Sequence, residues 1–183
     1  MTEEFIETTE VAKLIRKQLK RHFPGTKFSV RTQPGSSIRI RWTDGPAERV
    51  VHRVVRQFSG ATFDSTIDLK KRKVSYLLPD GSAMLADAPG TTENAGVIPA
   101  EKHAAPHPDA RLVRFMCDFI FCYREISEQY VERCREIWEN LDIDTACEIY
   151  NSRYFPKWPG DEDDGWRLAM YLSEGAPPSR GDD

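Results

Sequence analysis

The chain opens with a helical pattern of apolar positions. Apolar residues recur every three or four positions across residues 9–23, and basic residues fill most of the remaining positions. This spacing predicts an amphipathic helix. Thr8 or Thr9 is the expected N-cap, and Pro24-Gly25 is expected to end the helix.

Residues 26–58 predict a hairpin and a second helix. Alternating apolar and polar residues on either side of a Pro-Gly-Ser turn favour a β-hairpin over residues 26–43, and Asp44-Gly45-Pro46 ends it. Helical spacing returns in residues 47–58. The stripe expected to be buried consists of Val50, Val51, Val54, Val55 and Phe58.

A second hairpin completes the pattern of the first half. Residues 73–78 and 82–86 flank Pro79-Asp80-Gly81, a turn sequence. The element order is then α-β-β-α-β-β, which predicts an α+β fold with an antiparallel sheet and helices packed on one of its faces.

The second half predicts one more strand followed by helices. Residues 112–124 alternate, but both sets of side chains are largely apolar, which favours a strand buried inside a sheet. This strand either joins the N-terminal sheet or belongs to a separate part. Helices are predicted at residues 128–140, with Ser127 at the start, at 143–151 and near 166–172.

Charge divides the chain between these halves. Residues 1–75 hold 16 Lys and Arg against 8 Asp and Glu, whereas residues 76–183 hold 10 against 21. A basic part that meets phosphate or an acidic partner would produce this division, and so would two parts that neutralise each other. The predicted organisation is a basic domain at 1–86, a linker or long loop at 87–110, an acidic strand-plus-helices part at 111–174 and a disordered tail at 175–183.

Length and composition describe an ordinary globular protein. The chain has 183 residues, 39% of them hydrophobic and 30% charged, and no apolar run is long enough to cross a membrane. The acidic start MTEEFIETTE lacks the features of an export signal, so we expect a cytoplasmic protein. Four cysteines without a CxxC pair are expected to be reduced thiols.

Three segments carry a resemblance to a known family. The stretches EVAKLIRKQLKRHFPGTKFSVRT, SSIRIRWTDGP and FSGATFDSTID resemble the large polyvalent protein-associated domains of phages and conjugative elements, and DFIFCYREIS is similar to a strand found downstream of them. The matching landmarks are Phe23, Pro24, Gly25, Lys27, Phe28, Ser29 and Val30, then Trp42, Thr43, Asp44, Gly45 and Pro46, and finally Phe63, Asp64 and Asp68.

The resemblance implies a setting more than a chemistry. It implies a protein of a mobile element, in the cytoplasm of a bacterial host, that handles nucleic acid or acts against a host defence. It supplies no catalytic residue. We therefore expect a non-enzymatic binding protein.

The basic residues of the first half are the principal candidate site. Outward-facing arginines on the first hairpin and a basic run before the second hairpin are expected to form one surface that contacts a phosphate backbone or an acidic partner. The same arginines are also ordinary on an exposed strand. No outward aromatic residue is expected beside them. The candidates are Arg31, Arg39, Arg41, Lys70, Lys71, Arg72 and Lys73.

The acidic second half offers an alternative of another class. Its carboxylates could imitate a row of phosphates and block the nucleic-acid site of a host defence protein. An acidic helix face is also commonly no more than solvated. The candidates are Glu132, Glu136, Glu139, Asp161, Glu162, Asp163 and Asp164.

A minor alternative is a metal-dependent nuclease. Asp44, Glu48, Asp64 and Asp68 could together hold a magnesium ion, but the signal is weak, because Asp44 is better explained as a turn residue or helix cap. The sequence contains no glycine-rich phosphate loop and no HExxH motif. It therefore predicts no metal site and no cofactor, and it does not indicate an oligomeric state.

Overall fold

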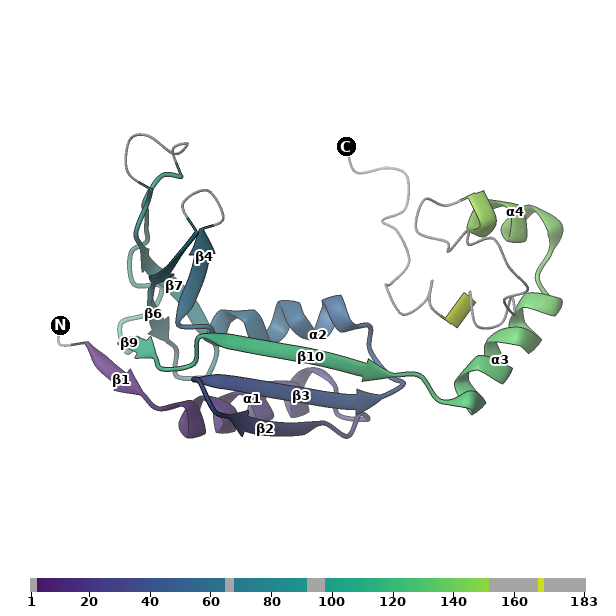
Figure 1. Ribbon diagram of the computed structural model, residues 1–183, viewed down its shortest axis with the longest axis horizontal. Helices are drawn as coiled ribbons and strands as arrows, with labels where there is room; N and C mark the ends of the chain where they lie inside the picture. The colour runs from purple at the N-terminus through teal and green to yellow at the C-terminus, as the bar shows by residue number, and fades with distance from the viewer. Residues whose placement is uncertain (1–2, 65–67, 92–97, 152–167, 170–183) are drawn as a thin grey trace. The chain divides into compact units, whose positions relative to one another are not determined.

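The chain folds into two compact units. The computed structural model describes residues 3–64, 68–91, 98–151 and 168–169 (Figure 1). Unit 1 comprises Met1–Arg41 with His52–Tyr123, and unit 2 comprises Trp42–Val51 with Arg124–Asp183. Counted over the sequence, unit 1 holds 18 Lys and Arg against 12 Asp and Glu, and unit 2 holds 8 against 17. The division of charge therefore follows the division of the fold.

A five-stranded sheet lies in unit 1. Its order is β1-β9-β6-β7-β8, with β1 parallel to β9 and every other pair antiparallel. The predicted hairpin of residues 73–86 is confirmed as β6 and β7, and Gly81 in its turn has a φ of 85°. The strands are β1 (Glu4–Ile6), β6 (Val74–Leu77), β7 (Ala83–Ala88), β8 (Glu101–Lys102) and β9 (Arg111–Phe115).

A second sheet, of three strands in the order β10-β3-β2, has helix α1 on one of its faces. The predicted first hairpin is confirmed as β2 (Ser29–Gln33) and β3 (Ser37–Thr43), which are antiparallel, and β10 (Phe119–Glu125) runs in the direction of β3 (Figure 1). Because side chains alternate along a strand, Ile38 and Ile40 are fully buried while Arg39 and Arg41 lie on the opposite face.

Helix α1 (Thr8–His22) confirms the first predicted helix. Its apolar stripe is buried, and Arg16 donates a hydrogen bond to the carbonyl of Val30 on β2 at 2.6 Å. The predicted caps are wrong. Glu7 is the N-cap without a side-chain hydrogen bond, because the hydroxyl of Thr8 instead donates to the carbonyl of Met116 at 2.6 Å.

The α+β class is confirmed, but the strands divide among three sheets where the sequence predicted one. The third is a hairpin of β4 (Ala61–Asp64) and β5 (Leu69–Arg72), in a region predicted to be a basic loop. The continuous buried strand predicted at 112–124 is also wrong. It breaks at Met116–Asp118 into β9 and β10, which belong to different sheets.

Helix α2 (Glu48–Val55) continues as a short 3-10 helix, η1 (Arg56–Phe58). Val51, Val55 and Phe58 are fully buried, as predicted. Val50 is 39% exposed, so its predicted place in the buried stripe is wrong. Adjacent residues in a helix point about 100° apart. Val50 therefore cannot share the buried face with both Val51 and Val55.

The segment 87–110 belongs to unit 1 and does not separate two domains. β7 reaches Ala88, and β8 pairs with it through Asp87↔Lys102 and Ala88↔Glu101. The segment predicted as a linker or long loop therefore includes these two pairs of the five-stranded sheet, and its residues 92–97 lie outside the described residues.

Unit 2 contains the predicted C-terminal helices, α3 (Glu128–Glu139) and α4 (Ile143–Asn151). The hydroxyl of Ser127 caps α3 by accepting the backbone N–H of Tyr130 at 3.1 Å. Cys134 is buried with Leu168 and Ala169. The remainder of the helix predicted near 166–172, and the tail at 175–183, lie outside the described residues.

Candidate nucleic-acid interface

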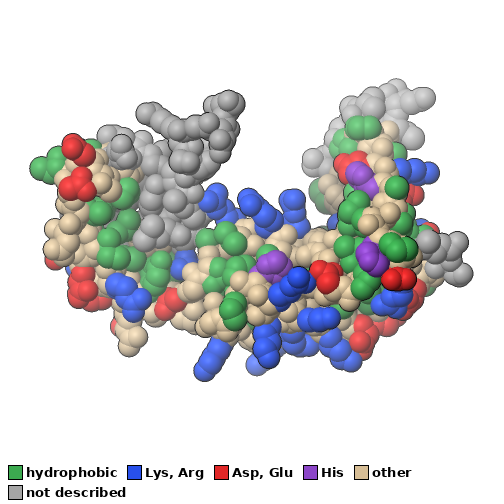
Figure 2. Space-filling model, turned by 180° about the vertical axis from the view of Figure 1, so that it is seen from behind, with side chains coloured by type: hydrophobic (Ala, Val, Ile, Leu, Met, Phe, Trp, Pro, Cys, Tyr) green, Lys and Arg blue, Asp and Glu red, His purple; other side chains and the backbone are tan. Residues whose placement is uncertain are grey.

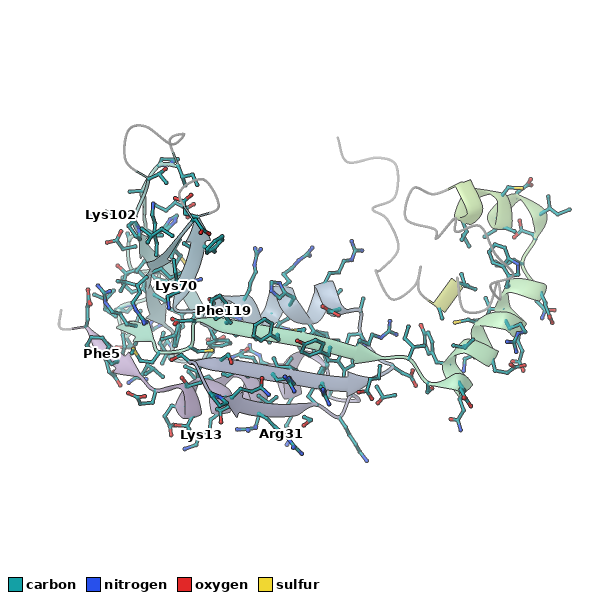
Figure 3. All side chains as sticks on the ribbon, viewed as in Figure 1. Phe5, Lys13, Arg31, Lys70, Lys102 and Phe119 are labelled. Carbon is teal, nitrogen blue, oxygen red and sulfur yellow. The ribbon has the colours of Figure 1, made fainter. Side chains whose placement is uncertain are left out.

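Three aromatic side chains form a row on the outer face of β10. Phe119, Phe121 and Tyr123 are 43%, 43% and 44% exposed, whereas Cys122 between them is buried. The rings of Phe119 and Phe121 are stacked, with centroids 6.2 Å apart and planes 20° from parallel. Figure 3 shows Phe119 standing out from β10. The expectation that no outward aromatics accompany the arginines is therefore wrong.

This row was not predicted from sequence, because residues 112–124 have the pattern of one strand with both faces buried. The available signal was the break at Cys117-Asp118, where a charged residue interrupts the apolar alternation. A strand that ends there and restarts can leave one aromatic face uncovered.

Arginines line the same face beside the aromatic row. Arg39 and Arg41 come from β3, and their guanidinium carbons lie 5.7 and 6.0 Å from the ring centre of Tyr123. Arg31 on β2 is directly opposite Arg39 in the register. We call Arg31, Arg39, Arg41, Phe119, Phe121 and Tyr123 the sheet platform.

The pairing of Arg31 with Arg39 is unfavourable within the protein itself. Like charges directly opposite each other on antiparallel strands repel, and no carboxylate among the described residues forms an ion pair with either guanidinium. A bound anion would relieve this repulsion.

Basic charge by itself does not distinguish the sheet platform. Figure 2, which views the structure from behind, shows Lys and Arg side chains on that face as well. Helix α1 is also basic, and its last turn alone carries Lys20 and Arg21. The combination of arginines with exposed aromatic rings is what sets the sheet platform apart.

The other predicted basic residues do not join this surface. Lys70 and Arg72 pair with the buried Asp118 at 2.7 and 3.3 Å, and Lys71 pairs with the buried Asp64 at 2.9 Å. These three cations therefore form ion pairs within unit 1 with two carboxylates, on and beside the β4–β5 hairpin. These ion pairs stabilise the fold of unit 1, whereas Arg31, Arg39 and Arg41 have no ion pair with any carboxylate in the described part of the chain.

Lys73 lies apart from them, in a cavity. It was expected to share the outward face with Arg31, but it precedes β6, a strand of the five-stranded sheet. Burial lowers the pKa of Lys73, and the positive charge of Arg56 lowers it further.

The predicted acidic surface is only partly described. Glu132, Glu136 and Glu139 are exposed on α3, where Glu132 forms an ion pair with Arg135. The other four candidates, Asp161, Glu162, Asp163 and Asp164, lie outside the described residues. Within the described part of α3, arginines alternate with the glutamates and dilute any continuous negative surface.

The carboxylates proposed for a metal site do not come together in the structure, and Glu48 is exposed on α2. Asp64 is buried against Lys71, and Asp68 is exposed with a φ of 51°. No three His, Cys, Asp or Glu side chains among the described residues are grouped so as to hold a metal ion.

The described cysteines are free thiols. Burial, and then the negative charge of Asp118, raise the pKa of Cys117 to about 12. This thiol therefore stays protonated at neutral pH and is a poor nucleophile.

Asp44 has a structural role in unit 2. Its two carboxylate oxygens accept hydrogen bonds from the backbone N–H and the hydroxyl of Ser127, at 2.9 and 2.7 Å. Its backbone N–H donates to Glu125 at 2.8 Å, and the indole N–H of Trp42 closes the turn on the carbonyl of Pro46 at 2.9 Å. The Trp-Thr-Asp-Gly-Pro turn thus fixes the residues that lead from β10 into α3.

We predict that Asp44→Ala destabilises unit 2. Asp44 has a φ of 56°, a left-handed conformation that an alanine adopts only at a cost of ~1–2 kcal/mol, and each lost hydrogen bond adds ~1 kcal/mol. A loss of ~2–4 kcal/mol is expected. Urea unfolding followed by tryptophan fluorescence measures it, because all 4 tryptophans belong to unit 2. Asp44→Asn, which tolerates this φ, should lose less, and an alanine variant as stable as the parent would contradict the role.

The family model described as Large polyvalent protein associated domain 29 matches residues 6–127. That span is about two thirds of the 183 residues. The chain belongs to this family. The match starts at Ile6 in β1 and ends at Ser127, whose backbone N–H donates a hydrogen bond to Asp44. It therefore contains β2, β3 and all of β10, the strands that carry the sheet platform. The family description names no activity.

No curated protein and no solved structure matches the chain. Across the residues that the structure describes, no helix combines the length and apolar character needed to cross a membrane.

Proposed function

We propose that this protein binds single-stranded nucleic acid on the sheet platform, without catalysing a reaction. The observation that carries the proposal is the row of exposed aromatic side chains on β10 beside the arginines of β2 and β3. Aromatic rings stack on bases, and arginines contact phosphates, so the two kinds of side chain address the two parts of a nucleotide.

The dimensions of the row suit a short segment of a strand. At ~3.3 Å per residue, the distance along β10 from Phe119 to Tyr123 is ~13 Å. Sheet-based RNA-binding domains stack two or three bases on aromatic side chains of a comparable surface. We expect the sheet platform to engage about the same number of bases.

The exposed rings favour a single strand over a duplex. Stacking on Phe119 or Phe121 requires a base whose flat face is accessible, and the bases of a duplex are already stacked on each other. Stacking on aromatic rings is available to every base, and contacts with phosphates carry no sequence information. Binding should therefore depend little on sequence.

The setting is part of the same proposal. As in the resemblance described above, we place the protein in a mobile element within a bacterial cytoplasm, where it would cover single strands or keep them from a host defence. Inhibition of a host protein through the acidic helix α3 is the competing hypothesis. It predicts a protein complex that changes to the sheet platform do not affect.

The arginine contacts are tested by the salt dependence of binding. For single strands the logarithm of affinity falls by ~0.7 per phosphate contact for each tenfold rise in salt. We expect Arg39→Gln/Arg41→Gln to reduce the slope by ~1.4 and to weaken binding of an oligothymidylate at ~50 mM salt. Fluorescence anisotropy over a salt series measures both quantities.

A matched control separates these contacts from net charge. Lys13→Gln/Lys20→Gln removes the same charge from exposed positions of α1 in unit 1. It should leave the slope unchanged. Equal effects of the two double variants, or no binding by the parent at low salt, would overturn the proposal.

A further inference from the structure

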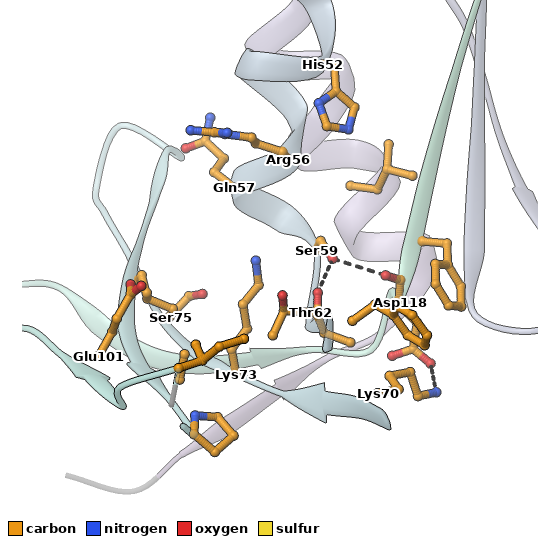
Figure 4. A pocket seen from close by; sticks show the side chains of 18 of the residues that line it. His52, Arg56, Gln57, Ser59, Thr62, Lys70, Lys73, Ser75, Glu101 and Asp118 are labelled. Atoms are coloured by element: carbon orange, nitrogen blue, oxygen red, sulfur yellow. Dashed lines mark hydrogen bonds and ion pairs between the residues drawn. The ribbon is translucent and has the colours of Figure 1, made fainter. Parts of the chain in front are cut away.

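A cavity of about 1010 Å³ opens in unit 1 next to the sheet platform. It is lined from one side by α2 and η1 and from the other by β4, β6, β7 and the segment around Pro99 (Figure 4). Pockets for small ligands occupy ~300–1,000 Å³, so this cavity is large enough for a whole nucleotide.

The lining of the cavity carries more cations than carboxylates: Arg53, Arg56, Lys70 and Lys73 against Glu101 and Asp118. Arg56 and the partly buried Lys73 both line it, and Figure 4 shows Lys73 extending toward the side on which Arg56 lies. Among the described residues, no carboxylate forms an ion pair with either cation. Asp118, which also lines the cavity, is already paired with Lys70 and Arg72.

The surroundings of Lys73 disfavour its positive charge. Burial lowers its pKa, and the charge of Arg56 lowers it further, because both disfavour a second positive charge in the cavity. A ligand that carries two negative charges would compensate both cations. A phosphomonoester has this charge at neutral pH, whereas each phosphodiester of a strand carries one.

The remaining walls suit the other parts of a nucleotide. Apolar side chains contribute much of the lining, and the hydroxyls of Thr62 and Ser75 lie in the same cavity as Lys73 (Figure 4). A base would pack against the apolar walls, and a sugar would hydrogen-bond to the hydroxyls. The larger apolar lining residues, besides Phe119, are Phe63, Leu85, Pro89, Ile98, Pro99 and Ile120.

Phe119 connects the cavity to the sheet platform. It lines the cavity, and its ring is also stacked on that of Phe121 in the aromatic row. A strand whose bases stack along β10 would therefore bring its terminal nucleotide to the mouth of the cavity.

We infer that this cavity binds the terminal phosphomonoester of a nucleotide through Lys73 and Arg56, so that the protein holds single strands by a phosphorylated end. The inference rests on the proposed function for the strand. The site itself would also accept a free nucleoside monophosphate, which has the same chemistry. The two sources are distinguished experimentally.

The test compares oligothymidylates of about ten nucleotides, within the usual site size of single-strand binders, that carry a 5′-phosphate, a 3′-phosphate or neither. Charge-assisted hydrogen bonds to the terminal phosphate should make one phosphorylated oligonucleotide bind ~10–100-fold more tightly than the unphosphorylated one. Lys73→Met should remove this preference and leave binding of the unphosphorylated strand unchanged. Lys102→Met, an exposed lysine of β8, is the control and should keep the preference.

A measurement on the unaltered protein does not depend on the folding of a variant. Acylation of Lys73 by an amine-reactive ester, quantified by peptide mass spectrometry, should be suppressed by the phosphorylated oligonucleotide and by thymidine monophosphate. Equal affinity for all three oligonucleotides together with unprotected Lys73 would overturn the inference, as would a preference that persists in Lys73→Met. Protection by thymidine monophosphate without oligonucleotide binding would support the cavity and overturn the proposed function.

Discussion

Phe119→Ala/Phe121→Ala is expected to weaken the binding of single-stranded nucleic acid by at least ~30-fold. Stacking of a base on an aromatic side chain contributes ~1–3 kcal/mol, so the loss of two such contacts at the lower limit amounts to ~2 kcal/mol. The two rings are stacked on each other at the start of the row, where they offer a continuous surface to successive bases. Titration of a fluorescent oligothymidylate with each variant gives the ratio of dissociation constants.

The controls for Phe119→Ala/Phe121→Ala test whether the fold is intact and whether any exposed phenylalanine would have the same effect. Both phenylalanines are 43% exposed, so their truncation removes little core packing, and thermal unfolding should confirm an intact fold. Phe5→Ala alters another exposed phenylalanine of unit 1, on β1, and should leave affinity unchanged. If the double variant binds as tightly as the parent, the aromatic row has no part in binding. If the parent instead self-associates and the variant does not, the row is an interface between copies.

Gly60→Ala is expected to have the largest effect on stability. A Cβ at Gly60 would lie 1.7 Å from the backbone oxygen of Phe115 and 2.8 Å from its carbonyl carbon. Gly60 also donates to Cys117 at 2.7 Å and accepts from Lys73 at 3.0 Å, so it cannot move away without breaking these contacts. Overpacking against backbone costs ~3 kcal/mol or more, which corresponds to a fall in melting temperature of ~6–12 °C.

Gly25→Ala provides the comparison for that prediction. No atom lies within 4 Å of the Cβ that this substitution would add, so the variant should melt close to the parent. Thermal unfolding followed by circular dichroism measures both variants. A Gly60→Ala protein as stable as the parent would mean that β9 and β4 do not meet at Gly60 as described.

The predictions from sequence succeeded where periodicity alone determines the element. α1, the β2–β3 hairpin and α3 each bury a stripe that local spacing defines, and their boundaries agree with the structure within a few residues. The outward position of Arg39 and Arg41 follows from the same alternation, because Ile38 and Ile40 must point into the core.

Which strands pair in each sheet could not be predicted from sequence, because the pairing joins segments far apart in the chain. β1 pairs in parallel with β9, more than 100 positions away in the sequence, and nothing in the local pattern of Glu4–Ile6 indicates it. The basic run at Lys70–Arg72 was misplaced for a related reason. Its counter-ions are Asp64 and Asp118, and only the fold brings Asp118 to β5.

The aromatic row illustrates why a site can escape sequence analysis. Phe119, Phe121 and Tyr123 have the composition of a core strand, and their exposure results from the place of β10 at the edge of a sheet whose outer face is open. Core packing would have hidden the same side chains. Large aromatic side chains left exposed in a row are an unusual arrangement, and the proposed contact with nucleic acid would account for them.

The central claim is that bases lie directly on the aromatic row, and photocrosslinking tests it most directly. An oligonucleotide in which 5-iododeoxyuridine replaces thymidine is bound at low salt, irradiated and digested, and the cross-linked peptides are sequenced. We expect cross-links at Phe119, Phe121 or Tyr123. Efficient cross-links confined to α1 or to unit 2, with none on β10, would contradict the claim.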